Sequence, residues 1–182
     1  MKNRYNKAIE LAREHHEGQL RKNTGEAYLT HPFAVAGLVA SVTTDEDMII
    51  AALLHDTVED SDLTLNEIEG HLGLRVRKLV DDLTDVSKPS DGNRGVRKRL
   101  DRQHTANSWP EAKTIKLADL IDNLKGIHTF SPGFADKYMK EKVLILKVLT
   151  EGDATLYKMV EKLLKEFFAK KPRYEKRVRF IS

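Results

Sequence analysis

The sequence predicts an all-α protein that folds as one helical bundle. Along most of the 182 residues, apolar side chains recur every three or four positions, which is the spacing of one face of an α-helix. No segment shows the alternation of apolar and polar residues that is typical of a half-buried strand. Because the length is that of one domain, we expect residues 1–182 to form a single domain.

The first third of the chain is expected to contain three helices. The first is amphipathic, and its apolar face holds Tyr5, Ala8, Ile9 and Ala12. The polar segment GQLRKNTGEAYLT, residues 18–30, is predicted to be a loop. A second helix starts at His31, where Pro32 is tolerated because a first-turn N–H has no partner within the helix. The third covers DEDMIIAALLHDTVED from Asp45, and its middle is apolar on nearly every side, as in a central helix.

Capping signals and helix breakers place the later helices. Thr64 and Glu67 form a capping-box pattern for a short helix that ends at Gly73, and another helix covers VRKLVDDLT. The segment KPSDGNRG is predicted to be a mobile loop, because Pro, Ser, Asp and Gly occur together in it. The remaining helices are expected at about 94–107, from Pro110 through EAKTIKLADLIDNLKGI, and at about 134–149 and 154–168.

The composition limits both the chemistry and the location. There is no cysteine, so disulfides are excluded, and a metal would have to be held by nitrogen and oxygen. No apolar run approaches the roughly 18 residues that a membrane span needs, and the start MKNRYNKAIE has no apolar signal core. We therefore expect a cytoplasmic protein with no membrane partner.

The formal net charge is only +3, but basic residues gather near the C-terminal end. The segment KKPRYEKRVRF, in a basic tail of about 169–182, sets its lysines and arginines against a single acid, Glu175. Such a tail can contact nucleic acid or an acidic protein, but a charge run is more often a solvated chain end. We adopt the second interpretation, so no nucleic-acid partner is expected.

Ionisable residues are concentrated in the segment AALLHDTVED. His55 and Asp56 fall inside an otherwise apolar helix, where an unpaired carboxylate is costly to desolvate. Glu59 and Asp60 stand one helical turn further on and would share their face. A salt-bridged surface stripe is the ordinary interpretation, but the segment has no Lys or Arg. A divalent cation would balance these charges better.

Further candidates lie outside that segment. Asp119, with Asn123 one turn later, belongs to the apolar helix IKLADLIDNL, although an ordinary polar helix face explains it equally well. His31 opens a helix after the loop, where a rigid turn can aim its ring inward; a lone histidine there is more often a cap or a surface residue. The other histidines have no second ligand at a telling spacing and are given structural roles: His15, His16, His71, His104 and His128.

In this order, the motifs LRKNTGEAYLTHP, AALLHDTVED and KLADLIDN closely resemble the hydrolase domain of RelA/SpoT-type proteins, and specifically the small stand-alone alarmone hydrolases. The resemblance covers roughly residues 1–150 and implies a single HD-domain helical bundle with a metal site between central helices. It also implies metal-dependent removal of the 3′-pyrophosphate of a (p)ppGpp-type alarmone, a small hyperphosphorylated nucleotide, which leaves GDP or GTP. Because no synthetase segment follows the helical domain, we expect the chain to degrade this signal and not to make it.

The resemblance also assigns roles to individual residues. The metal ligands that it implies are His31, His55, Asp56 and Asp119. The acidic pair that positions and deprotonates the attacking water is Glu59 and Asp60. The substrate-binding residues are Arg21, Lys22 and Asn123. The planar guanidinium of Arg21 could stack on the purine. One Mn²⁺ is the expected ion, while iron, cobalt and zinc remain open because two imidazoles and two carboxylates form a mixed set.

Departures from the family pattern concern the nucleotide side of the site. Ala27 replaces a usual loop proline, Asp122 stands where an aromatic residue or histidine usually precedes the asparagine, and Lys125 with Gly126 stands where an arginine is common. Base choice is therefore open, and a (p)ppApp hydrolase is one alternative. The native metal and the oligomeric state also stay open.

Two rival interpretations remain. The first is a general HD-domain nucleotide phosphohydrolase, against which the Arg21–Lys22 loop and the GEAYLTHP motif argue. The second is a basic helical binding module that has lost catalysis. All the predicted site residues are present, whereas a decayed site would be expected to lose its acids first.

Overall fold

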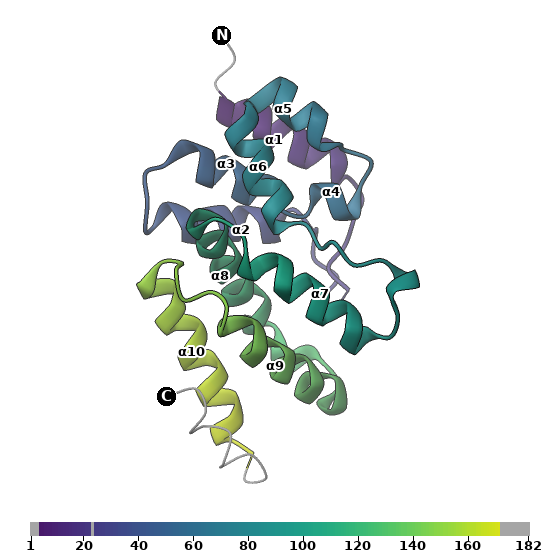
Figure 1. Ribbon diagram of the computed structural model, residues 1–182, viewed down its shortest axis with the longest axis vertical. Helices are drawn as coiled ribbons and strands as arrows, with labels where there is room; N and C mark the ends of the chain where they lie inside the picture. Colours follow the sequence, from purple (N-terminus) through teal and green to yellow (C-terminus); the bar gives the residue numbers. More distant parts are fainter. Residues whose placement is uncertain (1–3, 23, 172–182) are drawn as a thin grey trace.

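The computed structural model describes residues 4–22 and 24–171, and every regular element within these ranges is a helix (Figure 1). The α-helices are α1 (Arg4–His15), α2 (Thr30–Ala40), α3 (Glu46–Leu54), α4 (Thr57–Asp60), α5 (Leu65–Leu72), α6 (Leu74–Leu83), α7 (Arg94–Ala106), α8 (Pro110–Lys125), α9 (Pro132–Leu146) and α10 (Ala154–Ala169). Short 3-10 turns are η1 (Pro89–Asp91) and η2 (Ile127–Thr129). An isolated antiparallel bridge joins Leu20 to Ala27. The all-α prediction is confirmed.

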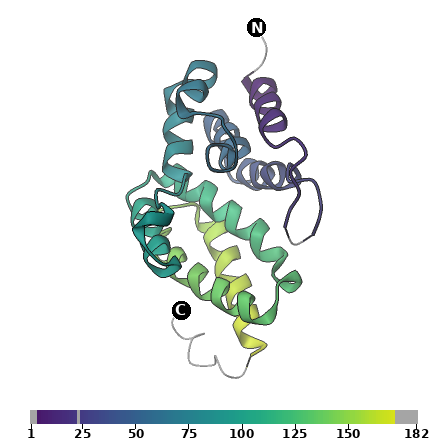
Figure 2. The same ribbon diagram turned by 90° about the vertical axis from the view of Figure 1, so that its right-hand side faces the viewer.

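Helix α8 is the centre of the bundle. It packs against α2, α3, α6 and α10, and Figure 2 shows it lying between the N-terminal helices and the pair α9 and α10. Ile115, Leu117, Leu120 and Ile121 are fully buried, because α8 has apolar neighbours around most of its circumference. A polar side chain at the middle of this helix is therefore enclosed by protein and needs a partner.

Several helices begin or end where the sequence predicts, and the chemistry of the end residues explains why. The Asp45 side chain accepts hydrogen bonds from the first turn of α3. Thr64 and Glu67 form the complete capping box of α5, and Gly73 ends that helix with a φ of 93°. Pro110 occupies the first turn of α8, where its missing N–H costs nothing. Local sequence signals thus fix where these helices start and stop.

The predicted third helix is wrong in one respect, because the structure divides it into α3 and α4 at His55 and Asp56. Side chains take up backbone carbonyls around the break. His55 Nδ1 donates to the Ala52 carbonyl at 2.8 Å, and Thr57 Oγ1 donates to the Leu54 carbonyl at 2.7 Å. Local bonds of this kind compete with the helical ladder. Because of the break, the side chains of α4 point in directions that they would not have in one continuous helix.

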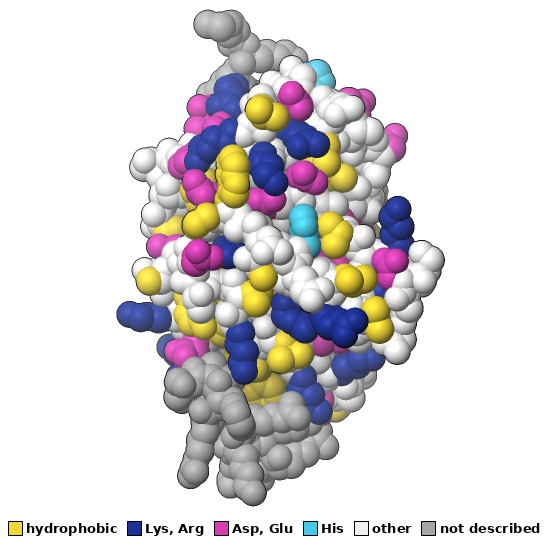
Figure 3. Space-filling model, viewed as in Figure 1, with side chains coloured by type: hydrophobic (Ala, Val, Ile, Leu, Met, Phe, Trp, Pro, Cys, Tyr) yellow, Lys and Arg dark blue, Asp and Glu magenta, His cyan; other side chains and the backbone are white. Residues whose placement is uncertain are grey.

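The next features are the side chains on the protein surface and the length and polarity of the helices. On the face seen in Figure 3, side chains of both charges are interspersed with single apolar ones. Among the described residues, no helix is both long and apolar enough to cross a bilayer. Residues 172–182 of the expected basic tail lie outside the described residues, so its interpretation stays a prediction.

The turn before α10 depends on a close approach to α8 that only glycine permits. A Cβ on Gly152 would lie 2.8 Å from Leu117 Cδ1 and 3.1 Å from both Lys113 C and Thr114 N. We expect Gly152→Ala to lower the free energy of unfolding by about 1–3 kcal/mol, because the backbone of α8 must move. Gly37→Ala is the matched control: its Cβ would meet nothing within 4 Å. In this helix interior the change should stabilise by about 0.5–1 kcal/mol. Urea denaturation of both variants distinguishes them, and equal stability would contradict this packing.

Candidate functional site

Two buried histidines meet where α2 passes the end of α3. His31 is in the first turn of α2, and His55 follows the last residue of α3. Their ring centroids are 5.1 Å apart. His31 Nδ1 lies 2.7 Å from Asp122 Oδ2, and His55 Nδ1 lies 2.8 Å from the Ala52 carbonyl. Both partners are acceptors, so each Nδ1 carries a proton, and Nε2 is the nitrogen of each ring that is left to bind a metal once it holds no proton.

Two carboxylates lie beside these Nε2 atoms. Asp56 Oδ2 is 3.5 Å from His31 Nε2 and 3.1 Å from His55 Nε2. Asp119 Oδ1, from the buried middle of α8, is 3.4 Å and 3.9 Å from the same two atoms. One potential ligand atom from each of His31, His55 and Asp56 lies within 4.8 Å of the others. The structure therefore brings together the four residues predicted as ligands, from three separate parts of the chain.

The donors in this cluster fit a divalent cation. His55 Nε2 is buried, and although Asp56 Oδ2 lies 3.1 Å away, the two atoms are not aligned for a hydrogen bond, so Nε2 makes none among the described residues. Such an atom is costly unless something binds its lone pair. Imidazole nitrogens and carboxylate oxygens together suit manganese, iron or zinc. The anchored Nδ1–H groups of His31 and His55 are also typical of metal-binding histidines, whose rings are oriented by an outer partner.

Without a cation, the carboxylates hold protons on the imidazoles. Burial would lower the pKa of His31, but its hydrogen bonds to Asp119, Asp122 and Asp56 raise it to about 11. For His55, burial is likewise outweighed by Asp56 and Asp119, and the pKa is raised. The cluster thus requires positive charge, supplied either by protons or by a metal.

Tyr28, from the loop before α2, contacts this cluster and was missed by the sequence reasoning. Its hydroxyl donates to Asp56 Oδ2. Burial, aided by the charge of Asp56, raises the pKa of Tyr28, so the hydroxyl remains a neutral donor. Its ring lies against those of His16 and His31, with centroids 4.8 Å and 5.8 Å away. The available signal was its place in GEAYLTHP, close before His31.

Lys116 was missed as well. Its Nζ lies 3.3 Å from Asp119 Oδ2, one turn earlier on α8. Burial would lower the pKa of Lys116, but the surrounding acids, Asp119 first, raise it. The sequence reasoning looked for cations within AALLHDTVED alone. The three-residue spacing to Asp119 in IKLADLIDNL was the signal that could have found it.

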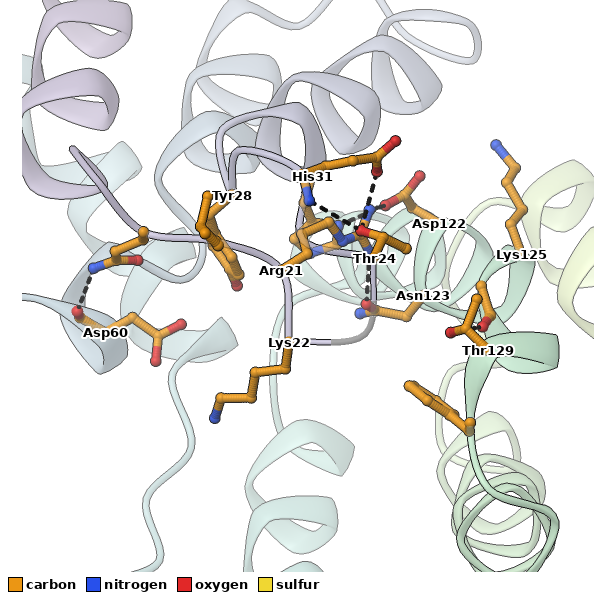
Figure 4. Close-up of a pocket in the computed structure, with 15 residues that line it drawn as sticks. Arg21, Lys22, Thr24, Tyr28, His31, Asp60, Asp122, Asn123, Lys125 and Thr129 are labelled. Atoms are coloured by element: carbon orange, nitrogen blue, oxygen red, sulfur yellow. Dashed lines mark hydrogen bonds and ion pairs between the residues drawn. The ribbon is translucent and has the colours of Figure 1, made fainter.

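The predicted substrate-binding residues have different surroundings. Arg21 donates to Asp122 at 2.8 Å and to Asn123 at 3.3 Å, so its guanidinium lies against α8 (Figure 4). Asn123 in turn donates to Asp119 at 2.5 Å. Lys22 is exposed and extends away from Asp122 and Asn123. Stacking of Arg21 on a purine stays a prediction.

The predicted acidic pair diverges after the break between α3 and α4. Asp60 has its carbonyl held by Gln19 Nε2 at 3.0 Å, on the side of the loop. Glu59 Oε1 instead accepts from the Asp85 N–H at 2.5 Å. Although the Glu59 residue is exposed to solvent, the protein packed around its carboxylate and the Asp85 charge raise the pKa of Glu59 to about 7. The premise that an unbroken helix puts Glu59 on the face of His55 does not hold.

One cavity reaches His31 of the cluster, and a second cavity lies beside Glu59. The larger has a volume of about 710 Å³, and its lining includes Arg21, Lys22, His31, Asp60, Asn123 and Lys125 (Figure 4). The second, of about 350 Å³, is lined in part by Glu59, Asp85, Arg94, Arg97 and Lys98. The larger one is in the range of small-molecule sites. Cations line both cavities, which favours a ligand with several phosphates.

Comparison with known proteins gives the same picture. The sequence profile of the family described as HD domain matches residues 8–142. The chain is 35% identical over 165 residues to the guanosine-3′,5′-bis(diphosphate) 3′-pyrophosphohydrolase MESH1 of Homo sapiens, covering 88% of this chain and 90% of that protein. It is 39% identical over 142 residues to the guanosine-3′,5′-bis(diphosphate) 3′-pyrophosphohydrolase of Aquifex aeolicus. That match covers 76% of this chain and 20% of the longer protein.

A solved structure agrees with these relatives. It is described as a metazoan ortholog of SpoT that hydrolyzes ppGpp, and it superimposes with a TM-score of 0.83 at 28% sequence identity. The match covers 92% of this chain and 97% of the other. The similarity therefore extends over the whole bundle and is not confined to the motifs.

The charge balance of the cluster predicts that metal binding releases protons. Because the pKa of His31 is raised to about 11, its ring is protonated at pH 7 and must lose a proton before Nε2 can bind an ion. We expect at least one proton to leave per Mn²⁺ bound, and the affinity to rise with pH. Titration calorimetry in buffers of different ionisation enthalpy measures this number. Heats that do not depend on the buffer would contradict the charge balance.

Proposed function

Because the chain belongs to the HD domain family, in its RelA/SpoT-type hydrolase branch, we propose that it hydrolyses the 3′-pyrophosphate of (p)ppGpp-type alarmones. The supporting observation is the convergence of two imidazole Nε2 atoms and two carboxylates beside a cation-lined cavity of about 710 Å³. The products are pyrophosphate and GDP or GTP. The relatives and the solved neighbour carry the same activity in their names.

The ligands that we propose for one divalent ion are His31, His55, Asp56 and Asp119. Manganese is the proposed metal, since mixed nitrogen and oxygen donors suit it. When bound, the ion supplies Lewis acidity, lowering the pKa of a water and neutralising phosphate charge. Tyr28 holds Asp56 through its hydroxyl, and Lys116 offsets the charge of Asp119 from within the bundle.

Glu59 is the proposed general base. Its pKa of about 7 suits proton transfer near neutral pH, because the carboxylate is both partly ionised and sufficiently basic. The water oxygen forms a bond to the phosphorus attached to O3′ while its proton passes to Glu59. The O3′–P bond breaks, pyrophosphate leaves, and O3′ takes up a proton. Asp60, on the opposite side beside the larger cavity, is proposed to orient the water and the nucleotide.

The substrate class follows from the cations around the site. Lys22 and Lys125 line the larger cavity, which we assign to the nucleoside and its 5′-diphosphate. Arg94, Arg97 and Lys98 line the second cavity beside Glu59, where they suit the departing pyrophosphate. Positioning and electrostatic stabilisation by such groups dominate phosphoryl-transfer catalysis.

Metal removal tests the proposed activity directly. We expect exhaustive chelation to abolish hydrolysis and Mn²⁺ to restore it, because the ion proposed between the Nε2 and carboxylate donors supplies the Lewis acidity that the reaction needs. The substrates to compare are ppGpp, pppGpp, ppApp, NADPH and dGTP, with the products resolved by anion exchange. Preferential release of pyrophosphate from ppGpp or pppGpp is expected. A protein that is fully active after verified metal loss, or one that prefers dGTP, would refute the proposal.

The division of labour between ligand and base can be separated by two variants. Asp56→Ala should lose bound metal and activity together. Glu59→Gln should keep its metal but lose turnover by roughly 10²–10⁴-fold, because it removes a base without opening the ligand set. In the parent protein, kcat/KM should fall as the pH drops through about 7, where Glu59 becomes protonated. If Glu59→Gln loses as much metal as Asp56→Ala, Glu59 is a ligand and this assignment is wrong.

A further inference from the structure

Arg21 links the loop before α2 to the C-terminal end of α8. Its two guanidinium nitrogens donate to adjacent residues, NH1 to Asp122 Oδ2 at 2.8 Å and NH2 to Asn123 Oδ1 at 3.3 Å. The side chains of Arg21 and Asp122 are only 20% and 10% exposed, so solvent screens this pair weakly. A planar fork suits two neighbouring acceptors in a way that a single ammonium group does not.

Each of these two acceptors also contacts a proposed metal ligand. Asp122 Oδ2 accepts from His31 Nδ1 at 2.7 Å. The Asn123 amide donates from Nδ2 to Asp119 Oδ1 at 2.5 Å. The guanidinium group of Arg21 is therefore linked to His31 through Asp122 and to Asp119 through Asn123.

This arrangement fixes orientations that would otherwise be free. An asparagine amide can present either its oxygen or its nitrogen, and donation from Arg21 to Oδ1 turns Nδ2 towards Asp119. The Asp122 carboxylate is held in the same way, so it stays in line with His31 Nδ1 and keeps Nε2 facing the carboxylate cluster.

We propose that Arg21 is a positioning residue of the metal site, which sets metal affinity through Asp122 and Asn123. The inference rests on the metal site of the proposed function, and it gives Arg21 a role besides any contact with the nucleotide. Because Arg21 belongs to the loop that lines the larger cavity, metal binding and nucleotide binding are coupled through it. Such coupling acts equally in both directions.

The test measures Mn²⁺ affinity by titration calorimetry without nucleotide, so it does not depend on turnover. Loss of an outer partner typically weakens metal binding about 10–100-fold, and we expect a loss of that size in Arg21→Ala. Arg21→Lys should lose nearly as much, because one ammonium cannot serve both acceptors. Lys22→Ala is the matched control for charge and loop position, and its metal affinity should stay within about twofold of the parent, since the side chain extends away from Asp122 and Asn123.

Two further measurements separate positioning from a loss of folded structure. Ethylguanidinium should restore Mn²⁺ affinity in Arg21→Ala, whereas ethylammonium should not, because only the former reproduces the fork. In a double-mutant cycle, Arg21→Lys and Asp122→Asn should be strongly non-additive. This cycle keeps the proposal testable if Arg21→Ala does not fold.

The outcomes are distinct. Weakened metal binding in Arg21→Lys with an unchanged Lys22→Ala supports the inference. Parent-like metal affinity in the Arg21 variants overturns the inference and leaves the proposed function standing. A parent protein that binds no Mn²⁺ overturns both.

Discussion

Four ionisable side chains converge inside an apolar bundle, and most features of the site depend on balancing their charge. Asp56 and Asp119 are held against the Nε2 atoms of His31 and His55, where water cannot solvate them freely. An isolated buried carboxylate would be prohibitively costly, so the carboxylates must meet positive charge. In the metal-free protein, the protonated imidazoles and the Lys116 ammonium group supply this positive charge. In the proposed enzyme, a divalent cation replaces the protons on the imidazoles.

The break between α3 and α4 serves the same charge balance. Helix α3 ends at Leu54, and the Nδ1–H group of His55, the next residue, donates to the Ala52 carbonyl and leaves Nε2 facing the cluster. After the break, Glu59 and Asp60 point into different cavities. One cavity is lined by Glu59, whose pKa is raised, together with several cations, and the other has the larger volume. The two cavities therefore have chemically different linings.

Much of the fold could be predicted from the sequence, because its signals are local. The caps at Asp45 and Thr64, the breaker Gly73 and the three- and four-residue spacing depend on neighbouring residues only. The break at His55 could not be predicted in this way, since apolar periodicity continues through it and the competing bonds are made by side chains.

The site was partly predictable for the same physical reason. The His-Asp pair and Asp119 were conspicuous as charges in apolar helices. The roles of Tyr28, Lys116 and Asp122 depend on contacts between distant segments, and Arg21 reaches Asp122 across a separation of 101 residues. No local pattern specifies such contacts. Asp122 was noticed only as a departure from the family motif, although it lies directly behind His31.

Anomalous diffraction at the manganese absorption edge, from crystals grown with Mn²⁺, tests the central claim most directly. One anomalous peak is predicted between the Nε2 atoms of His31 and His55 and the carboxylates of Asp56 and Asp119, within coordination distance of all four. A cluster without a peak, or an ion that does not contact His55 Nε2, would contradict a metal-balanced site.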